Sequence, residues 1–489
     1  MLIFMDKLAL RKIKLLELLS LENREFNIIE ISSYLGCTDR TVLKTIQCLK
    51  VDFESWKDNI EIINRDNKFI YLKKSIYFSL ELIQLNYLKN SLTFNACNDI
   101  FHQRYVDTNT FASKNYVSYP TMNRRIKQLK PLLNKFKLLY LSKPRATFVG
   151  SEKQFRYFFY LFYWNSYWGM EWPFPMVKKE DYKYLLKDIE KIINQKLSIS
   201  EQEMFLCWLA ISISRIKLGA LIDEMELYRQ ISENNWLYPI FKDMLIPVLK
   251  DVGNLNEREL ENEVLFLFSV LNAFAYYSKA DERLSQLLIF TQHHKASYVE
   301  ATNVWIKTFC SFFNINFNVE EYSIMFGNLF HLHFHAVLFD GPSILFDNKN
   351  NIQLINHFQL YSKKIKDFYN ILLQNKKLAP IFQKRDLLFP RYLCLIQKYI
   401  NYSSFGKKIR VYVSSIYGTV FEEDLGNMIK KRNAGMIEII NDIEKEIDLI
   451  ISDRIYPVLK NKNIPIFIWH DIPNNTDWEN LSSFLATFP

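Results

Sequence analysis

The chain has 489 residues, 49% of them hydrophobic, which is enough for about three to four domains with buried cores. With only 11 Gly and 14 Pro we expect a mainly helical protein, and the absence of any apolar run of about eighteen residues argues against a membrane-spanning helix. The amino terminus lacks a small-residue cleavage site, so we expect a cytoplasmic protein, and the six scattered Cys predict neither disulfides nor zinc.

Positive charge is concentrated in the first third of the chain. Residues 1–155 contain 25 Lys and Arg against 15 Asp and Glu, a net of +10; the whole chain carries +9, so residues 156–489 sum to −1. Because attraction to phosphate depends on local positive potential, this segment is the expected contact with nucleic acid.

Residues 28–49, IIEISSYLGCTDRTVLKTIQCL, have the pattern of two short helices joined by a tight turn, preceded by an amphipathic helix over 6–20 that turns Leu8 and Leu19 inward. Gly36 suits the turn, and Thr38 suits the N-cap of the second helix. One face of each short helix is apolar: Ile31, Leu35, Val42, Ile46 and Leu49. The opposite face of the second helix carries side chains suited to phosphates and base edges: Asp39, Arg40, Lys44, Thr45 and Gln47.

The same pattern recurs eighty residues later. Thr38 aligns with Ser118, and the apolar residues align with Met122, Ile126 and Leu129. The second copy presents Asn123, Arg124, Lys127, Gln128 and Lys130 on its outer face. A single copy would fit an ordinary helical hairpin as well as a DNA reader, but two copies in one register favour a repeated helix-turn-helix.

A predicted β-hairpin, or wing, follows each copy. Residues 60–72 give two short strands around a polar turn, and residues 138–150 give a second pair with Lys143 and Arg145 at its tip. Basic wing tips commonly contact the DNA backbone, although simple solvation of a loop explains these two residues equally well. We therefore predict two winged-helix domains, over 1–74 and 75–155, the second beginning with a helix over about 76–90.

Residues 156–282 and 283–403 predict two helical bundles of similar length. In the first we expect helices near 152–168, 178–196, 200–218, 222–247 and 256–278. Neither bundle carries a P-loop, HExxH, GxSxG or glycine-rich dinucleotide motif, so we expect no enzyme and no cofactor.

Six of the eight His lie between 293 and 357, including His331, His333 and His335 in FGNLFHLHFHAVLFDG. A strand would place these three on one face, as metal ligands require. We prefer a helix, because Asn318 and Glu321 form a capping box, and a helix places His331 and His335 together. From the residues alone, these side chains then either fill core or surface or bind metal; we assign no metal site.

Residues 404–489 alternate near-continuously apolar strands with helices, which predicts a small parallel α/β sheet. The loop after the first strand, Ser414 to Gly418, is the usual ligand position in such sheets.

This order of parts resembles the Mga and AtxA type of virulence regulators of Gram-positive bacteria. The resemblance implies that the bundles are sugar-phosphotransferase regulation domains and that the last domain is similar to the enzyme IIB component of that system. It also implies double-stranded DNA as partner, a homodimer through the carboxy-terminal domain, and phosphotransferase-system phosphocarrier proteins as possible partners, with His331 and His335 as phosphorylation candidates.

The sequence departs from this family pattern at three points. Residues 156–280 contain no His, so the first bundle cannot be switched by histidine phosphorylation. Ser414 or Ser415 stands where a phosphate-accepting Cys is expected, which implies a non-catalytic last domain. The second helix-turn-helix has Asn115 where the first has Leu35.

The sequence therefore predicts a DNA-binding transcriptional regulator. The predicted DNA contacts are Arg40, Lys44, Gln47, Asn123, Arg124, Lys127, Gln128, Lys143 and Arg145. The alternatives are a phosphotransferase-system phosphocarrier and a protein-binding scaffold whose basic segment meets an acidic partner.

Overall fold

The computed structural model describes residues 2–141, 148–193, 195–223, 226–277, 279–292, 294–342, 359–397, 399, 408–432, 437–460 and 464–487. The chain is mainly helical and divides into two compact units. Unit 1 comprises Met1–Ile306, Phe317–Asn348 and Lys377–Leu388; unit 2 comprises Lys307–Asn316, Lys349–Lys376 and Phe389–Pro489. Among the helices of these described ranges, none is long and apolar enough to cross a membrane.

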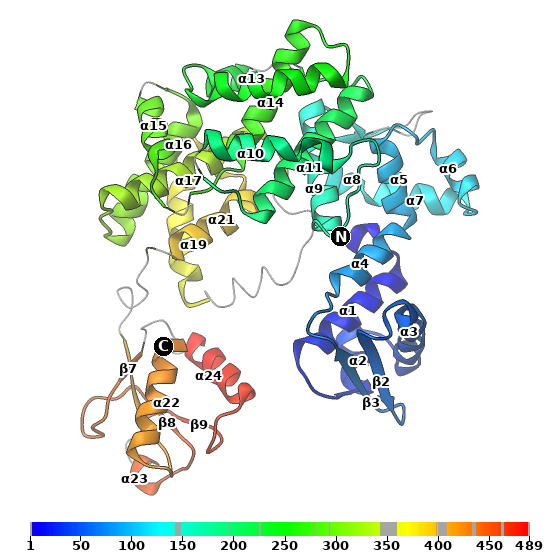
Figure 1. Cartoon of the computed structure of the whole chain (residues 1–489). Coiled ribbons are helices and arrows are strands. Elements are labelled where there is room, and N and C mark those ends of the chain that lie inside the picture. The colour runs from blue at the N-terminus through cyan, green and yellow to red at the C-terminus, as the bar shows by residue number, and fades with distance from the viewer. Residues whose placement is uncertain are drawn as a thin grey trace. The chain divides into compact units, whose positions relative to one another are not determined.

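The first domain of unit 1 is a winged helix, as predicted (Figure 1). Its strand β3 lies between β1 and β2, with Phe26 opposite Ile70 and Ile62 opposite Leu72, and all pairs are antiparallel. The helices and sheet enclose a single core that includes Leu15, Ile31 and Leu49. The elements are η1 (Leu2–Phe4), α1 (Lys7–Leu21), β1 (Phe26–Asn27), α2 (Ile28–Leu35), α3 (Asp39–Asp52), η2 (Phe53–Trp56), β2 (Ile60–Arg65) and β3 (Phe69–Lys74).

Two side chains in this domain lie opposite to their predicted positions. Leu8, expected to face the helix-turn-helix, is 39% exposed. Thr45, expected on the outer face of α3, is 1% exposed, and its hydroxyl donates to the Thr41 carbonyl at 2.7 Å. A Thr that satisfies its own hydroxyl within the helix carries no polar penalty in the core, so helical periodicity alone could not place it.

The second domain repeats this plan with a longer lead-in. The helix predicted over about 76–90 is present as the shorter α4 (Glu81–Lys89). A second helix, α5 (Leu92–Phe101), which Ser91 caps, follows it and was not predicted. The remaining elements are α6 (Thr108–Lys114), α7 (Tyr119–Gln128), α8 (Lys130–Lys135), β4 (Leu139–Tyr140) and β5 (Phe148–Val149).

The helices that follow begin with α9, which carries buried aromatic side chains on nearly every face. The predicted helix over 222–247 is two helices, α12 and α13; the other predicted helices of this stretch are present. The elements are α9 (Glu152–Tyr167), η3 (Lys179–Tyr182), α10 (Lys183–Ile192), α11 (Ile199–Lys217), α12 (Glu226–Ser232), α13 (Leu237–Val252) and α14 (Glu257–Ala273).

A buried charge network joins α9, α11 and α14. Arg156 and Glu263 are both 0% exposed and form a bidentate pair, with Nη1 to Oε2 at 2.6 Å and Nη2 to Oε1 at 2.8 Å. Glu152 accepts from the Nε atoms of Arg156 at 3.0 Å and of Arg215 at 2.8 Å. The carboxylates outweigh the burial of Arg156, so its pKa is raised and it stays charged.

The second predicted bundle contains α15 (Glu282–Gln292), α16 (Ser297–Phe313), α17 (Val319–Leu338), α19 (Gln359–Leu373), α20 (Ala379–Phe382) and α21 (Arg385–Gln397). The preference for a helix over a strand at the histidine cluster is confirmed, because Asn318 and Glu321 form both hydrogen bonds of a capping box at the start of α17.

The last part of unit 2 is the predicted parallel sheet, with strand order β7-β6-β8-β9. Val411 and Leu449 belong to the core on one sheet face, which α22 and α24 cover; Ile450 faces Leu459 of α23 on the other (Figure 1). In β6, β8 and β9, alternate residues thus pack into different cores, which explains why these strands are mostly apolar. The elements are β6 (Ile409–Ser414), α22 (Thr419–Arg432), β7 (Ile437–Ile439), β8 (Leu449–Ser452), α23 (Pro457–Lys460), β9 (Ile466–Ile468) and α24 (Asn475–Thr487).

Candidate nucleic-acid interface

The first helix-turn-helix is set by local backbone chemistry. Gly36 has φ 61°, a left-handed conformation that ends α2, and the Cys37 N–H donates to the Ser32 carbonyl at 3.1 Å. Thr38 then caps α3 by accepting from the Thr41 N–H. Val42, Ile46 and Leu49 are buried, as predicted. The same rotation of the helix leaves three predicted contacts exposed: Arg40, Lys44 and Gln47.

The second copy reproduces this geometry at the same eighty-residue spacing. Tyr116 stands in the place of Gly36 and has φ 55°, and the Val117 N–H donates to the Ala112 carbonyl at 3.0 Å. Ser118 caps α7 by accepting from the Thr121 N–H, and Pro120 lies in the first turn, where its missing N–H costs little. The repeat inferred from the sequence is therefore also a repeat of backbone structure.

The structure brings four predicted residues of α7 together. Asn123, Arg124, Lys127 and Gln128 line one surface hollow. Arg124, Lys127 and Gln128 are exposed, whereas Asn123 is half-buried and its Oδ1 has no hydrogen-bond partner among the described residues. Tyr119, 43% exposed, completes the hollow with Pro120. Tyr119 was not predicted from the sequence, although its position in the first turn of the recognition helix could have suggested it.

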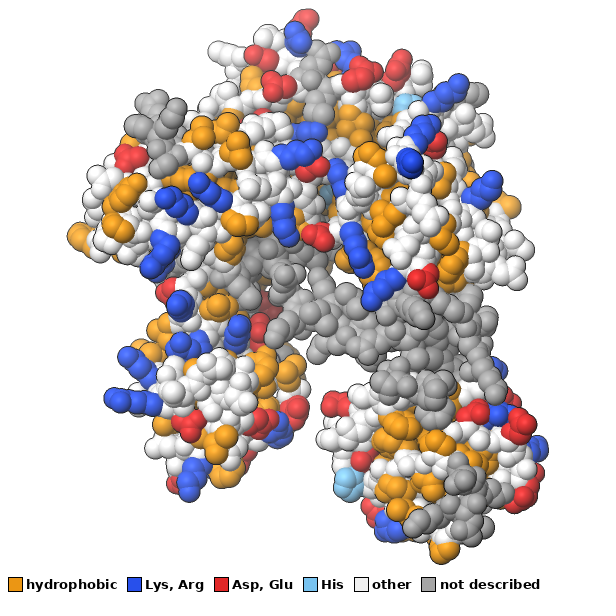
Figure 2. Space-filling model, turned by 180° about the vertical axis from the view of Figure 1, so that it is seen from behind, with side chains coloured by type: hydrophobic (Ala, Val, Ile, Leu, Met, Phe, Trp, Pro, Cys, Tyr) orange, Lys and Arg blue, Asp and Glu red, His pale blue; other side chains and the backbone are white. Residues whose placement is uncertain are grey.

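The cationic side chains of these two helices are free to neutralise external anions. Within the described part of the chain, no ion pair involves Arg40, Lys44, Arg124 or Lys127. In Figure 2, Lys and Arg side chains stand out at the left edge of the first domain, at lower left, on the side where Figure 1 shows α3. Unpaired cations on an exposed helix are what phosphate contacts require.

The predicted contacts Lys143 and Arg145 lie outside the described residues. The strands that would lead to them are present, because Leu139 pairs with Val149 and Tyr140 with Phe148. Their role at the wing tip stays a prediction.

The histidine cluster is buried, which favours core filling among the three alternatives. His331, His333 and His335 are 2%, 0% and 2% exposed. His331 lies against the Tyr277 hydroxyl, His333 shares a hydrogen bond with the Thr302 hydroxyl at 2.9 Å, and His335 shares one with the Tyr157 hydroxyl at 3.1 Å. Burial lowers the pKa of His331 and of His333 to about 3, so both are neutral. Phosphorylation of His331 or His335 stays a prediction, and it would require α17 to open.

The loop after β6 was expected to be a ligand position, but two carboxylates of the protein itself accept hydrogen bonds from its donor groups. Asp453 Oδ2 accepts from the Ser415 hydroxyl at 2.8 Å and from the Ile416 N–H at 2.9 Å, and Glu422 accepts from the Ser415 N–H at 2.8 Å. The loop donors that would meet a phosphoryl group are therefore already paired. Asp453 lies 38 residues from Ser415, which is why sequence reasoning missed it.

Among the described residues, no group of three or more His, Cys, Asp or Glu is arranged to hold a metal ion.

Comparison with known proteins agrees with this geometry. Residues 7–56 match the family described as the M protein trans-acting positive regulator (MGA) HTH domain, and residues 76–163 match the Mga helix-turn-helix domain. The chain is 25% identical to the anthrax toxin expression trans-acting positive regulator of Bacillus anthracis, over 99% of each chain. It is also 25% identical to the capsule synthesis positive regulator AcpA of the same organism, over 98% of this chain and 96% of the relative. A putative trans-acting regulator of Streptococcus pneumoniae is 25% identical over 74% of this chain and 72% of its own length.

Proposed function

We propose that the chain is a regulator of the Mga type, a DNA-binding transcriptional regulator whose helices α3 and α7 contact double-stranded DNA. The observation that carries the assignment of the contact is the hollow on α7, where four polar side chains meet with no internal ion pair. Similar regulators are named as positive regulators, so we propose that the outcome of binding is activation.

Each recognition helix has the dimensions and side chains for the major groove. An α-helix fits that groove, and Arg, Asn and Gln can form paired hydrogen bonds to base edges. Arg124 and Lys127 lie one turn apart or less on the same face of α7, so both can reach one groove and its flanking phosphates. Asn123 is half-buried in the hollow between these side chains, and its Oδ1, which has no partner among the described residues, would be available as a hydrogen-bond acceptor for the DNA.

The second winged helix is also attached to the helices that follow it, which gives a physical basis for regulation. Gln154 of α9 donates to the Phe136 carbonyl at 2.9 Å and to the Asp340 carbonyl at 3.1 Å. Lys137 pairs with Asp340 at 2.8 Å. A change in α17, which ends just before Asp340, would therefore reach the segment that follows α7 and α8.

We expect the full-length protein to bind a labelled mixed-sequence duplex with an affinity that falls steeply between roughly 50 and 200 mM salt, measured by fluorescence anisotropy. Arg124→Glu combined with Lys127→Glu should weaken binding by roughly tenfold or more, because two phosphate-seeking charges become repulsive. The pair Arg40→Glu and Lys44→Glu tests α3 in the same way.

The matched control is Lys187→Glu with Lys250→Glu, which changes the net charge equally at exposed positions of α10 and α13. It should leave the affinity within about twofold of the unmodified protein. Absence of binding at low salt would refute the DNA proposal; an equal loss in the control pair would refute the assignment of the contact to α7.

We further propose that the protein is a homodimer through the carboxyl edge of the sheet in unit 2. Because β6, β8 and β9 are parallel, the segments that follow them meet at one edge. These segments expose a set of apolar side chains: Ile416, Tyr417, Val420, Ile455 and Ile472. Val420 is 84% exposed and Ile472 is 65% exposed. Apolar side chains exposed together in this way are typical of an interaction surface, and the same edge of a second copy would cover them. Figure 2 shows hydrophobic side chains on the surface of this domain, at lower right.

The dimer is tested by light scattering after size exclusion. The protein should elute with about twice its chain mass of 58.6 kDa, and Val420→Asp with Ile472→Asp should return it to a single chain. Ile199→Asp with Val319→Asp, which are 81% and 85% exposed on unit 1, should have no effect on mass. A monomeric unmodified protein at micromolar concentration contradicts the proposal.

A further inference from the structure

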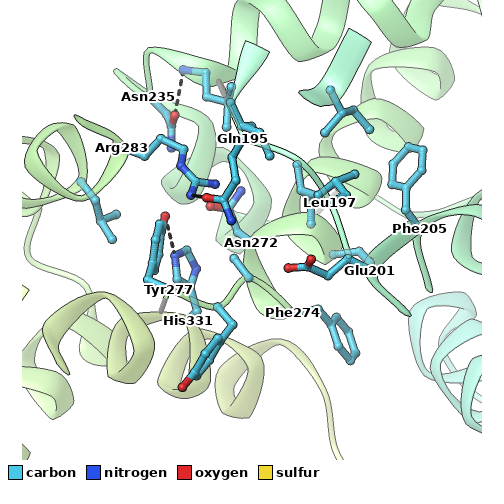
Figure 3. A pocket seen from close by; sticks show the side chains of 18 of the residues that line it. Gln195, Leu197, Glu201, Phe205, Asn235, Asn272, Phe274, Tyr277, Arg283 and His331 are labelled. Carbon is cyan, nitrogen blue, oxygen red and sulfur yellow. Dashed lines mark hydrogen bonds between the residues drawn. The ribbon is translucent and has the colours of Figure 1, made fainter. Parts of the chain in front are cut away.

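Unit 1 contains an apolar pocket that the DNA-binding function does not use (Figure 3). It lies among α10, α11, α13, α14, α15 and α17, is open on one side, and has a cavity volume of about 130 Å³. The walls are mainly apolar: Ile189, Met204, Phe205, Trp208, Leu267 and Phe290. Pockets of this kind, with few polar groups, are typical of small-molecule sites.

The cationic side chain at the pocket is already paired by the protein. The guanidinium of Arg283 pairs with Asp281, with Nε to Oδ2 at 2.9 Å, bonds the Gln195 amide, and lies over the ring of Tyr277 at 5.0 Å from its centroid. Glu201 is held by the start of its own helix, where it accepts from the Ser198 N–H at 2.7 Å. An anionic ligand would therefore lose its hydration without finding an unpaired counter-charge, and the Glu201 carboxylate would repel it.

Two side chains at the pocket have unused hydrogen-bonding capacity among the described residues: His331, and Trp208, whose Nε1 has no hydrogen-bond partner. His331 is 2% exposed, and its Nε2 lies 3.4 Å from the Tyr277 hydroxyl. The Asn272 backbone lies close enough to the ring to raise its pKa against the larger effect of burial, but Nδ1 makes no hydrogen bond of ordinary geometry in the described part of the chain. Figure 3 shows Tyr277 and His331 side by side, with Arg283 and Gln195 next to them. A buried imidazole nitrogen without a partner is costly, and a ligand hydrogen-bonding group would remove that cost.

We propose that this pocket binds a small, largely apolar molecule that carries no negative charge and has one hydrogen-bonding group. The apolar walls take its body, and the His331 imidazole receives its polar group. The ligand contacts six helices of unit 1, so it stabilises their packing. This inference does not depend on DNA binding, because the experiment reads binding in the pocket directly.

The experiment uses N-phenyl-1-naphthylamine, an uncharged two-part aromatic amine whose fluorescence rises in apolar surroundings, titrated into the full-length protein. We expect saturable binding of one molecule per chain. The sulfonated analogue 1-anilinonaphthalene-8-sulfonate has the same rings and amine with a negative charge, and 1-phenylnaphthalene has the rings without the N–H. Both should bind at least roughly tenfold more weakly, the second measured by competition.

Ala275→Trp places an indole in the pocket from the segment after α14 and should weaken binding of the naphthylamine by roughly tenfold or more. Met204→Trp, from α11, provides a second blocking variant should the first fail to fold. The control Ala296→Trp adds the same side chain at a half-buried position outside the pocket and should bind as the unmodified protein does.

Each component of the proposal has an outcome that overturns it. Absence of saturable binding, or equal binding by the two blocking variants and the control, removes the site. Equal affinity for the sulfonate shows that the pocket accepts anions, and equal affinity for phenylnaphthalene shows that no hydrogen bond contributes.

Discussion

Arg156→Met is expected to lower the free energy of unfolding of the helical part of unit 1 by about 3–5 kcal/mol, the range found when one partner of a buried ion pair is removed. The substitution leaves the Glu263 carboxylate, which is 0% exposed, without its bidentate partner. It also removes the donor to the Ala220 carbonyl, at 3.0 Å from Nη2. The measurement is urea unfolding followed by tryptophan fluorescence, which Trp208 on the neighbouring α11 reports.

The double variant Arg156→Met with Glu263→Leu separates the cost of an unpaired buried charge from the cost of the cavity that the shorter side chain leaves. Removing both charges leaves no uncompensated ion, so part of the stability should return even though the Ile222 N–H loses its acceptor at 3.0 Å. Lys191→Met, which breaks the exposed pair with Asp188, should change the unfolding curve little. A double variant less stable than Arg156→Met alone would contradict the buried-charge explanation.

Acidification from pH 7 to pH 5 is expected to destabilise unit 1 by about 2 kcal/mol for each of His331 and His333. In the folded protein, burial lowers the pKa of both to about 3, whereas an unfolded His has a pKa of about 6.5. Between these values the unfolded chain binds protons that the folded chain does not. Stability is therefore full above about pH 6.5 and falls as the pH drops toward 3.

His333→Leu tests this origin of the pH dependence. It removes one neutral imidazole, so the difference in unfolding free energy between pH 7 and pH 5 should shrink by about 2 kcal/mol. Phe330→Leu, on the same helix, changes packing without removing a titratable group and should keep the difference. His102, whose pKa burial lowers to about 4, contributes to the slope in all variants alike. An unchanged difference in His333→Leu would contradict the prediction.

The sequence determined the features that rest on contacts within a few residues. Thr38 and Ser118 cap their helices, and Asn318 with Glu321 starts α17, because each bond joins residues only three apart. The alternation of buried and exposed positions in α3 and α7 follows from helical periodicity, so the exposed Arg40, Lys44, Arg124 and Lys127 could be named in advance. The parallel sheet of unit 2 likewise followed from its apolar strands.

Only the tertiary structure decided which polar groups are buried and what they meet. Arg156 and Glu263 are 107 residues apart, His335 and Tyr157 are 178 apart, and Asp453 meets a loop 37 to 38 residues away. Local pattern cannot distinguish a polar side chain that faces water from one whose partner arrives on a distant helix, since both occupy the same helical positions. The burial of Thr45, the neutral histidines of α17 and the apolar pocket beside them all arise from such packing between distant segments.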